Sequence, residues 1–335
     1  MVRATRLQRA MPRLLPVLLA GLLAVGLWSS RADAVGRCAN RGDLDAMYCD
    51  DDEDLVADLP EDRTKWQNPG VLFFSYTPAE DPSVYVNMFK PFLAHLEQVT
   101  GRQVRYFSAQ SYAAQIEAMR SGRLHIAGIA TGPTAFAVNL AGYVPFALMG
   151  TEKGQYGYRL QVIVPANSPI RSLADLKRRT VAHTEESSNS GNQAPRALLP
   201  SEGLIPDVDY TVVYSGGHDR SVLGVAHGDY DAATIASGVM ERMMERGVVK
   251  REAIRVIWQS DLFPTTSFGH VYSLDPVLAL RIRKAFFTYD IKGSPLGKEF
   301  KAVDGFIPIS YKQHWAVIRQ IQKANDVKYT REAVK

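Results

Sequence analysis

Short side chains that donate hydrogen bonds cluster in the stretch Ser188-Asn189-Ser190-Gly191. The glycine lets a ligand approach the backbone closely. The stretch follows an expected strand and opens an expected helix, so free N–H groups and the helix dipole would favour negative charge there. Such a site could hold a tetrahedral oxyanion without a lysine or an arginine. The alternative is an ordinary Ser/Asn helix cap.

Three further side chains stand where an expected strand or helix begins. His218 follows Ser215-Gly216-Gly217, and its ring could donate a hydrogen bond to an oxyanion. Tyr112 begins an expected helix and Tyr158 an expected strand, so each phenol could contact a ligand oxygen or wall off a cleft. The alternatives are a capping or core histidine, and two packing tyrosines among the 15 of the chain.

A serine hydrolase is the enzymatic alternative, with a serine of the same turn, His218 and Asp219 in the catalytic roles. However, the chain contains no Gly-x-Ser-x-Gly motif. Asp219 also adjoins His218 in the sequence instead of lying where a carboxylate could orient the ring. We therefore expect a binding protein that is not an enzyme and uses no cofactor or metal.

Strands and helices alternate from Val71 onward, which predicts two α/β lobes built on mostly parallel sheets flanked by helices. The expected strands are Val71–Thr77, Val104–Ser108, Leu124–Ala130, Tyr158–Pro165, Thr180–Thr184, Thr211–Tyr214, Ala232–Ala236 and Arg255–Trp258. The expected helices include Ser83–Thr100, Tyr112–Ser121 and Val239–Arg246, and residues 276–335 are expected to be helical. Ligands of such folds bind at the carboxyl ends of the strands.

Four stretches together resemble the phosphonate/phosphite/phosphate substrate-binding proteins of ABC importers. They are Ser111 to Ala127, Tyr156-Gly157-Tyr158, Ser188-Asn189-Ser190-Gly191 and Ser215-Gly216-Gly217-His218-Asp219. The resemblance extends from about Val71 to Trp315, and the family's usual Ser-Thr-Ser-Gly is Ser-Asn-Ser-Gly here.

The resemblance implies a two-lobed type II periplasmic binding fold with the ligand in the cleft between the lobes. Residues 68–157 and 267–335 would form lobe 1, and residues 158–266 would form lobe 2. Ser188, Asn189 and Ser190 would hold the phosphorus oxygens, aided by the amides of Ser190 and Gly191. His218 would contact the same group, Tyr112 would reach in from lobe 1, and Tyr158 would close the cleft.

The resemblance also bears on the ligand and the partner. Relatives that bind an aminoalkyl phosphonate carry acidic residues at two positions that are Gly238 and Thr266 here, which favours a small oxyanion without an amine. Carboxylates of Glu80 or Asp81 could enter the cleft instead. The expected partner is the membrane permease of the importer, with the chain itself a monomer. A sulfonate or another small anion is the alternative ligand.

Residues 1–34 have the features of a signal peptide, with a basic start, the apolar run Leu14 to Trp28 and small residues at Ala32-Asp33-Ala34. We expect cleavage after Ala34 and a periplasmic protein. The segment holds five arginines and one aspartate, so the net charge of +4 belongs to it and the remainder is neutral. The charge therefore indicates no nucleic-acid partner. A DNA-binding regulator would carry a helix-turn-helix where this segment lies.

Residues 35–67 are expected to form an extension before the main fold. Its two cysteines, Cys38 and Cys49, lie close in the sequence of an exported chain, which favours a local disulfide over two free thiols. Several acidic residues of the extension fit the spacing of a calcium loop, but Leu55 stands where that loop needs glycine. A solvated acidic loop is therefore expected.

Overall fold

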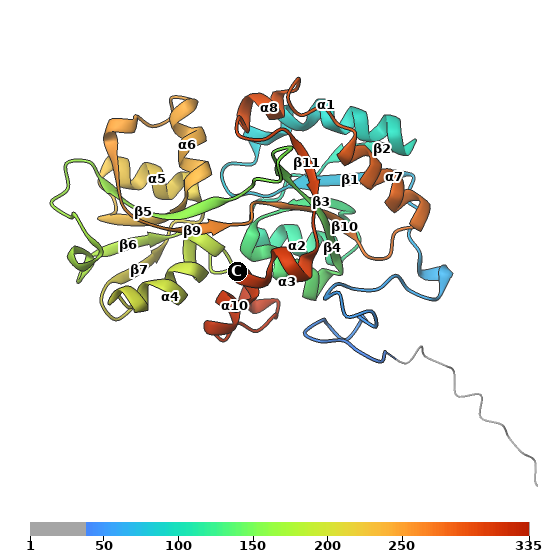
Figure 1. The fold of residues 1–335 in the computed structure, drawn as a ribbon, viewed down its shortest axis with the longest axis horizontal. Coiled ribbons are helices and arrows are strands. Elements are labelled where there is room, and N and C mark those ends of the chain that lie inside the picture. Colours follow the sequence, from blue (N-terminus) through green and yellow to red (C-terminus); the bar gives the residue numbers. More distant parts are fainter. Residues whose placement is uncertain (1–37, 335) are drawn as a thin grey trace, which may run out of the picture. The chain divides into compact units, whose positions relative to one another are not determined.

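The computed structural model describes residues 38–334, so the expected signal peptide and its cleavage site lie outside the described residues. Two sheets with helices packed against them make up this part of the chain (Figure 1). Within the described residues, none of the helices has the length and apolar character needed to cross a membrane. The α/β class expected from the sequence is confirmed.

The first sheet has six strands in the order β11-β4-β10-β3-β1-β2. The strands are β1 (Val71–Tyr76), β2 (Gln103–Tyr106), β3 (Ile126–Ile129), β4 (Tyr143–Gly150), β10 (Ser267–Val271) and β11 (Gly305–Pro308). The helices between and after them are α1 (Ser83–Thr100), α2 (Tyr112–Arg120), α3 (Thr131–Ala141), α7 (Pro276–Phe287), α8 (Pro295–Glu299), α9 (Tyr311–His314) and α10 (Ala316–Ala324).

The second sheet has five strands in the order β7-β6-β8-β5-β9. The strands are β5 (Tyr158–Pro165), β6 (Thr180–His183), β7 (Thr211–Tyr214), β8 (Ala232–Ala236) and β9 (Ile254–Phe263). Its helices are α4 (Ala194–Leu198), α5 (His218–His227) and α6 (Ser237–Glu245). The shorter helical segments of the chain are η1 (Arg63–Lys65), η2 (Leu173–Leu176), η3 (Asn189–Gln193), η4 (Leu199–Glu202), η5 (Arg251–Ala253) and η6 (Glu332–Val334).

Both sheets are mixed, where the sequence analysis expected mostly parallel ones. Strands β1, β2 and β3 pair in parallel, as do β6, β7 and β8, but β4, β10 and β11 are antiparallel to their neighbours. Strand β5 is antiparallel to both β8 and β9. The chain passes from one sheet to the other between β4 and β5 and returns between β9 and β10, and these connecting strands supply the antiparallel pairs.

The region after residue 276 was expected to be helical, and β11 corrects this. Gly305–Pro308 pairs with β4 at the edge of the first sheet. A four-residue edge strand carries too little alternation to be distinguished from a loop by its sequence. Strands β4 and β10 were also absent from the expected set.

Helix α1 shows how the apolar pattern builds the core. The sequence predicts an apolar face of Tyr85, Phe89, Phe92, Leu93 and Leu96, and all five side chains are buried. Gly101 ends the helix with φ 68°, a left-handed conformation that glycine adopts without strain. Phe89 and Phe92 of this face meet Phe74 of β1, with ring centroids 5.1 and 5.7 Å apart. Two smaller apolar clusters pack around the second sheet, so each sheet has a core of its own.

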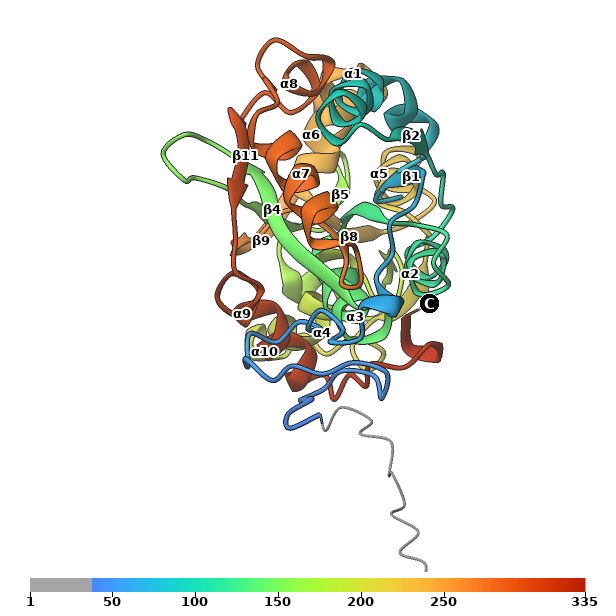
Figure 2. The same cartoon turned by 90° about the vertical axis from the view of Figure 1, so that its right-hand side faces the viewer.

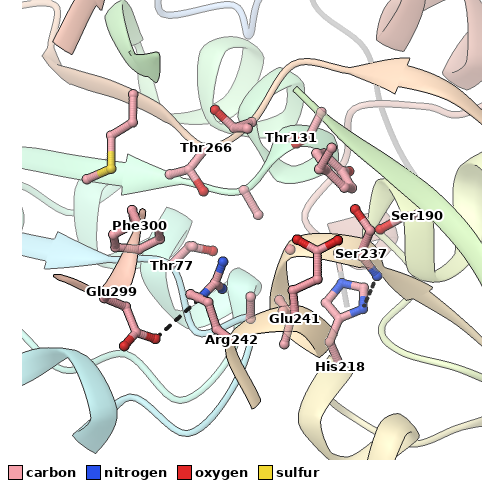
Figure 3. Close-up of a pocket in the computed structure, with 18 of the residues that line it drawn as sticks. Thr77, Thr131, Ser190, His218, Ser237, Glu241, Arg242, Thr266, Glu299 and Phe300 are labelled. Carbon is pink, nitrogen blue, oxygen red and sulfur yellow. Dashed lines mark hydrogen bonds and ion pairs between the residues drawn. The ribbon is translucent and has the colours of Figure 1, made fainter. Parts of the chain in front are cut away.

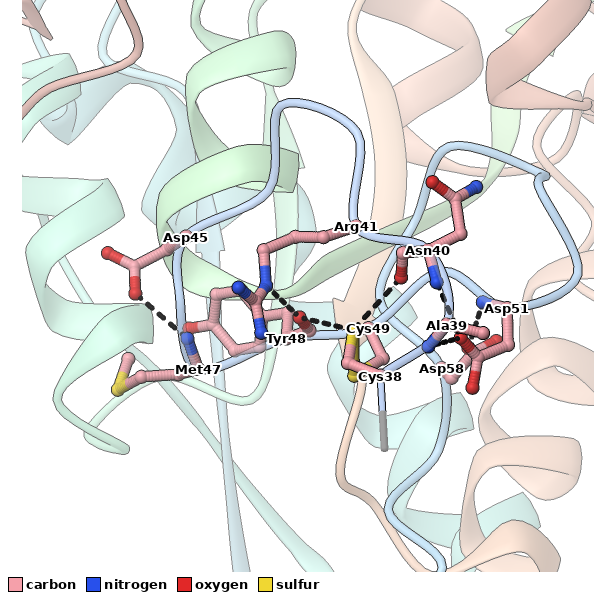
Figure 4. The surroundings of a disulfide bond; sticks show 10 residues. All are labelled: Cys38, Ala39, Asn40, Arg41, Asp45, Met47, Tyr48, Cys49, Asp51 and Asp58. Atoms are coloured by element: carbon pink, nitrogen blue, oxygen red, sulfur yellow. Dashed lines mark hydrogen bonds between the residues drawn. A yellow bond between two sulfur atoms is a disulfide. The ribbon is translucent and has the colours of Figure 1, made fainter. Parts of the chain in front are cut away.

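The extension before β1 packs against the first sheet's elements, and its expected disulfide is confirmed. Cys38 and Cys49 are bonded with their Cα atoms 5.4 Å apart, within the usual range for disulfides (Figure 4). The backbone N–H of Asp45 donates to the carbonyl of Asn139 at 2.8 Å. The ring of Tyr48 packs edge-on against Tyr272, and Figure 2 shows the segment passing beside α3.

The acidic loop of the extension is exposed at residues 51–54, as expected of a solvated loop, and of its acidic residues only Asp50 is buried. The side chains of Asp50, Asp52 and Asp54 approach within 4.8 Å of one another. Asp50 is only 1% exposed, and its carboxylate accepts the backbone N–H of Leu55 at 3.1 Å. Asp50 therefore organises the turn, and burial raises the pKa of its carboxyl.

Candidate functional site

A pocket of about 260 Å³ lies where the carboxyl ends of parallel strands from both sheets meet (Figure 3). Thr77 follows β1, Thr131 follows β3, and Ser237 follows β8; all three line the pocket. Further walls come from the turn after β6, from α6, from residues 299–303 and from the two connections between the sheets, including Tyr158 and Thr266. The pocket is therefore placed as the strand order of such sheets predicts.

The Ser188–Gly191 turn forms one wall of this pocket. Ser188, Asn189 and Ser190 line it and are at most 3% exposed. Ser188 caps the π-helical turn η3 by accepting the N–H of Gly191 at 3.2 Å, so it also serves as the helix cap considered above. Gly191 lies outside the lining, and a Cβ on it would collide with the hydroxyl of Thr184.

His218 lines the same wall and is held as a neutral donor. It begins α5 and is 3% exposed. Its Nδ1 accepts the backbone N–H of Ala236 at 3.1 Å, which places the ring proton on Nε2, 3.4 Å from Ser188 Oγ. Burial, and secondly the charge of Arg242, lower the pKa of His218 to about 3, so the ring stays neutral at physiological pH.

The two predicted tyrosines complete this end of the pocket. Tyr112 is 2% exposed at the start of α2, and its hydroxyl interacts with Ser188. Tyr158 receives a hydrogen bond from Asn189 Nδ2 at 3.1 Å and also interacts with Thr131 and Ser190. Burial raises the pKa of both phenols, so both remain protonated. The structure thus brings together every predicted site residue except Gly191, which lies behind the turn.

The sequence analysis missed several residues of the pocket. Thr77, Thr131 and Ser237 each follow the carboxyl end of a strand, so the rule that found Ser188 could have found them. Arg242 and Glu241 lie within α6 and line the pocket without any local motif. Gly238 and Thr266, where amine-binding relatives were expected to carry acidic residues, also line it.

A largely buried group of four charges bounds the opposite end of the pocket. Arg242 and Arg246 come from α6 of the second sheet, whereas Glu80 follows β1 and Glu299 ends α8 of the first. Glu80 accepts from Arg242 at 3.3 Å and also pairs with Arg246. Glu299 lies 2.5 Å from Arg246 Nη1 and 3.5 Å from Arg242 Nε. We call these residues the four-charge cluster.

The structure shows where the carboxylates of Glu80 and Asp81 lie. Glu80 is 4% exposed, but both its oxygens are paired with arginines, and Tyr85 donates to it at 2.5 Å. Asp81 is exposed, and its carboxylate accepts the N–H of Ser83. Neither residue lines the pocket.

The two sheets bring the N-termini of helices and several buried hydroxyl groups to one shared pocket. Such an arrangement is typical of a protein that binds a small polar ligand. Residues 74–315 match the family described as "ABC transporter, phosphonate, periplasmic substrate-binding protein". The match covers more than half of the chain, so the chain belongs to this family. The resemblance drawn from the four motifs is confirmed.

Individual relatives agree with this assignment. The chain is 27% identical to the phosphate-import protein PhnD of Mycolicibacterium smegmatis, over 78% of this chain and 85% of that protein. It is 31% identical to the phosphonates-binding periplasmic protein of Escherichia coli, over 52% of this chain and 53% of that protein.

Solved structures share the fold. A binding protein component of an ABC phosphonate transporter from Pseudomonas aeruginosa has a TM-score of 0.68 and 26% identity, covering 76% of this chain and 87% of that one. PhnD1 from Prochlorococcus marinus, in complex with methylphosphonate, has a TM-score of 0.69 at 19% identity, covering 77% and 99%. At that identity the second likeness shows the fold alone.

Proposed function

We propose that this chain captures a small phosphorus oxyanion (a phosphonate, phosphite or phosphate) in the pocket and delivers it to the membrane permease of an ABC importer. The observation that carries the proposal is the wall of neutral donors formed by Ser188, Ser190, His218, Tyr112 and Tyr158. Hydrogen bonds to a charged acceptor are the strong ones, and these donors are already fixed in a buried setting.

The side chain of Asn189 favours an anionic ligand at this wall. Its Oδ1 is buried without a hydrogen-bond partner while its Nδ2 donates to Tyr158. Turning the amide over would let Tyr158 donate to Oδ1 and would free Nδ2 to donate to a ligand oxygen. An oxyanion at this place would therefore satisfy a polar group that the protein alone leaves unpaired.

The same wall favours binding over hydrolysis. A catalytic histidine needs a carboxylate on Nδ1–H, whereas Nδ1 of His218 accepts a backbone N–H. The carboxylate of Asp219 instead accepts the backbone N–H groups of Asp81 and Arg220. These hydrogen bonds support a binding subunit over an enzyme. That the subunit is a monomer is part of the same proposal.

Export and lobe closure belong to the same proposal. The leader is cleaved after Ala34, and the disulfide of the extension 35–67 fits an oxidising compartment. Residues 68–157 and 267–335 act as lobe 1 and residues 158–266 as lobe 2. The connections between β4 and β5 and between β9 and β10 serve as the hinge about which the lobes close on the ligand.

A calorimetric panel tests the function. Phosphate, phosphite and methylphosphonate should bind more tightly than aminoethylphosphonate, because Gly238 and Thr266 offer no carboxylate to an ammonium. A ligand at 100 times its dissociation constant should add about 2.7 kcal/mol of stability. Sulfate and an alkanesulfonate test the alternative ligand class. If they bind tightly and none of the phosphorus ligands binds, the proposal is refuted.

A further inference from the structure

The wall of neutral donors described above, which includes Ser188 and Ser190, is called the serine wall. The pocket has a second polar end, opposite this wall, that the proposed function does not use. Figure 3 shows Arg242 and Glu299 at this end, away from Ser190 and His218. The guanidinium of Arg242 lies over the ring of Phe300, 4.9 Å from its centroid. This stacking and the surrounding charges hold the side chain in place.

Within the described residues, the guanidinium of Arg242 makes its hydrogen bonds through Nη2 alone. Its Nη2 lies 3.3 Å from both Glu80 and the hydroxyl of Tyr85, and its Nε lies 3.5 Å from Glu299 Oε1. Within residues 38–334, Nη1 donates no hydrogen bond, and the buried Nε makes none either, although Glu299 faces it. The Nη1 edge of the guanidinium is therefore left without an acceptor, on a side chain that is 15% exposed.

Gly238 keeps the space beside this edge open. A Cβ added to Gly238 would come within 3.4 Å of Arg242 Nη1 and would meet no other heavy atom within 4 Å. Both residues line the pocket. The free N–H groups of Nη1 therefore face space that a ligand can fill.

The charges at this end favour an acceptor over a cation. The two arginines and two glutamates of the four-charge cluster balance, and both oxygens of Glu80 are paired. The four-charge cluster would offer an ammonium a guanidinium and no free carboxylate, whereas an oxygen would satisfy Nη1.

We infer that Arg242 selects the ligand's substituent, so that the preferred ligand is a phosphonate whose far end carries an acceptor oxygen, as a short phosphonocarboxylate does. The inference rests on the proposed function, which places the phosphorus oxygens at the serine wall. Arg242 is then a specificity residue that binds only the far end of the ligand.

Selection by Glu241, the neighbour of Arg242, would predict the opposite ligand preference. It is exposed, lines the pocket, and forms no hydrogen bond or ion pair with residues 38–334. If Glu241 read the substituent instead, an aminoalkyl phosphonate would be preferred. The two adjacent side chains therefore allow a direct comparison.

Isothermal titration calorimetry on the exported chain decides between them, with methylphosphonate, phosphonoacetate and aminoethylphosphonate as probes. We expect phosphonoacetate to bind about tenfold or more tightly than methylphosphonate. Arg242→Gln should bring this ratio close to one, and Arg242→Lys, which keeps a charged donor, should retain part of it. Circular dichroism would check that both variants are folded.

Arg246→Gln is the matched control, because Arg246 pairs with the same two glutamates but does not line the pocket. It should weaken both ligands by a similar factor and leave their ratio unchanged. A wild-type preference for aminoethylphosphonate that Glu241→Gln abolishes would overturn the inference. Binding of methylphosphonate without any gain for phosphonoacetate would overturn it and leave the proposed function intact. Failure of all three probes to bind while phosphate or phosphite binds would overturn the inference alone, and failure of those two anions as well would overturn both.

Discussion

Ser190 presents its hydroxyl at the serine wall, is 1% exposed and interacts with Tyr158. Removing a donor to a charged acceptor costs about 1.5–3 kcal/mol, so Ser190→Ala should lower affinity for the phosphorus ligand by roughly tenfold or more. Calorimetry measures the change.

Ser187→Ala is the control for that variant. Ser187 does not line the pocket, and its hydroxyl donates to the carbonyl of Val334 at 3.0 Å. The substitution should therefore reduce stability and change ligand affinity little. Equal losses of affinity in Ser187→Ala and Ser190→Ala would mean that the turn acts only as a helix cap.

Glu185 carries a pH dependence that can be isolated by mutation. Burial raises the pKa of its carboxyl to about 7, although the N–H of Tyr112, 3.3 Å away, lowers it. The Glu185 carboxyl thus holds its proton more tightly in the folded protein than in the unfolded chain, where its pKa is near 4.5. Stability from this residue is present below pH 4.5 and is lost as pH rises toward 7.

Glu185→Gln should remove this loss of stability with rising pH, because the glutamine side chain does not titrate. The melting temperature of the wild type minus that of the variant should fall between pH 5 and pH 8, as measured by thermal unfolding at several pH values. A difference that stays constant over this range would show that the carboxyl titrates normally.

At the scale of elements, the four-charge cluster joins α6 of the second sheet to α8 and the loop after β1 of the first. Glu299→Gln removes one of the two carboxylates that pair with Arg246 and Arg242, so Glu80 alone would balance two partly buried arginines, which is costly. Because the pairs form only where the sheets meet, the variant should release ligand several-fold faster. Stopped-flow dissociation kinetics measures this rate.

Glu152→Gln provides the comparison, since Glu152 pairs with Lys292 at 2.9 Å and is 78% exposed. Exposed ion pairs contribute little, so this variant should release ligand at the wild-type rate. Equal rates in Glu299→Gln and Glu152→Gln would exclude a role for the cluster in holding the lobes together.

At the scale of the whole molecule, two connections and two separate cores predict closure of the lobes as rigid units. Small-angle X-ray scattering should show a smaller radius of gyration once ligand saturates the wild type. Ser190→Ala at the same ligand concentration should show a smaller change. An unchanged radius at saturation would argue against closure.

The sequence by itself determined the features whose causes are local. The apolar face of α1 follows from helical periodicity, and the Cys38–Cys49 bridge joins residues only 11 apart. The serine turn and His218 could be placed because polar residues between a strand and a helix gather at the carboxyl end of a sheet. These predictions needed no knowledge of how the sheets meet.

Only the tertiary structure decided what lies opposite the serine wall. Arg242 and Glu80 are 162 residues apart, and no pattern within α6 distinguishes a pocket arginine from a surface one. The mixed pairing of β4, β5, β10 and β11 likewise depends on where the chain crosses between sheets. Ion pairs and strand pairs of this kind form between distant segments, so their partners are set by the packing of the sheets and not by neighbouring residues.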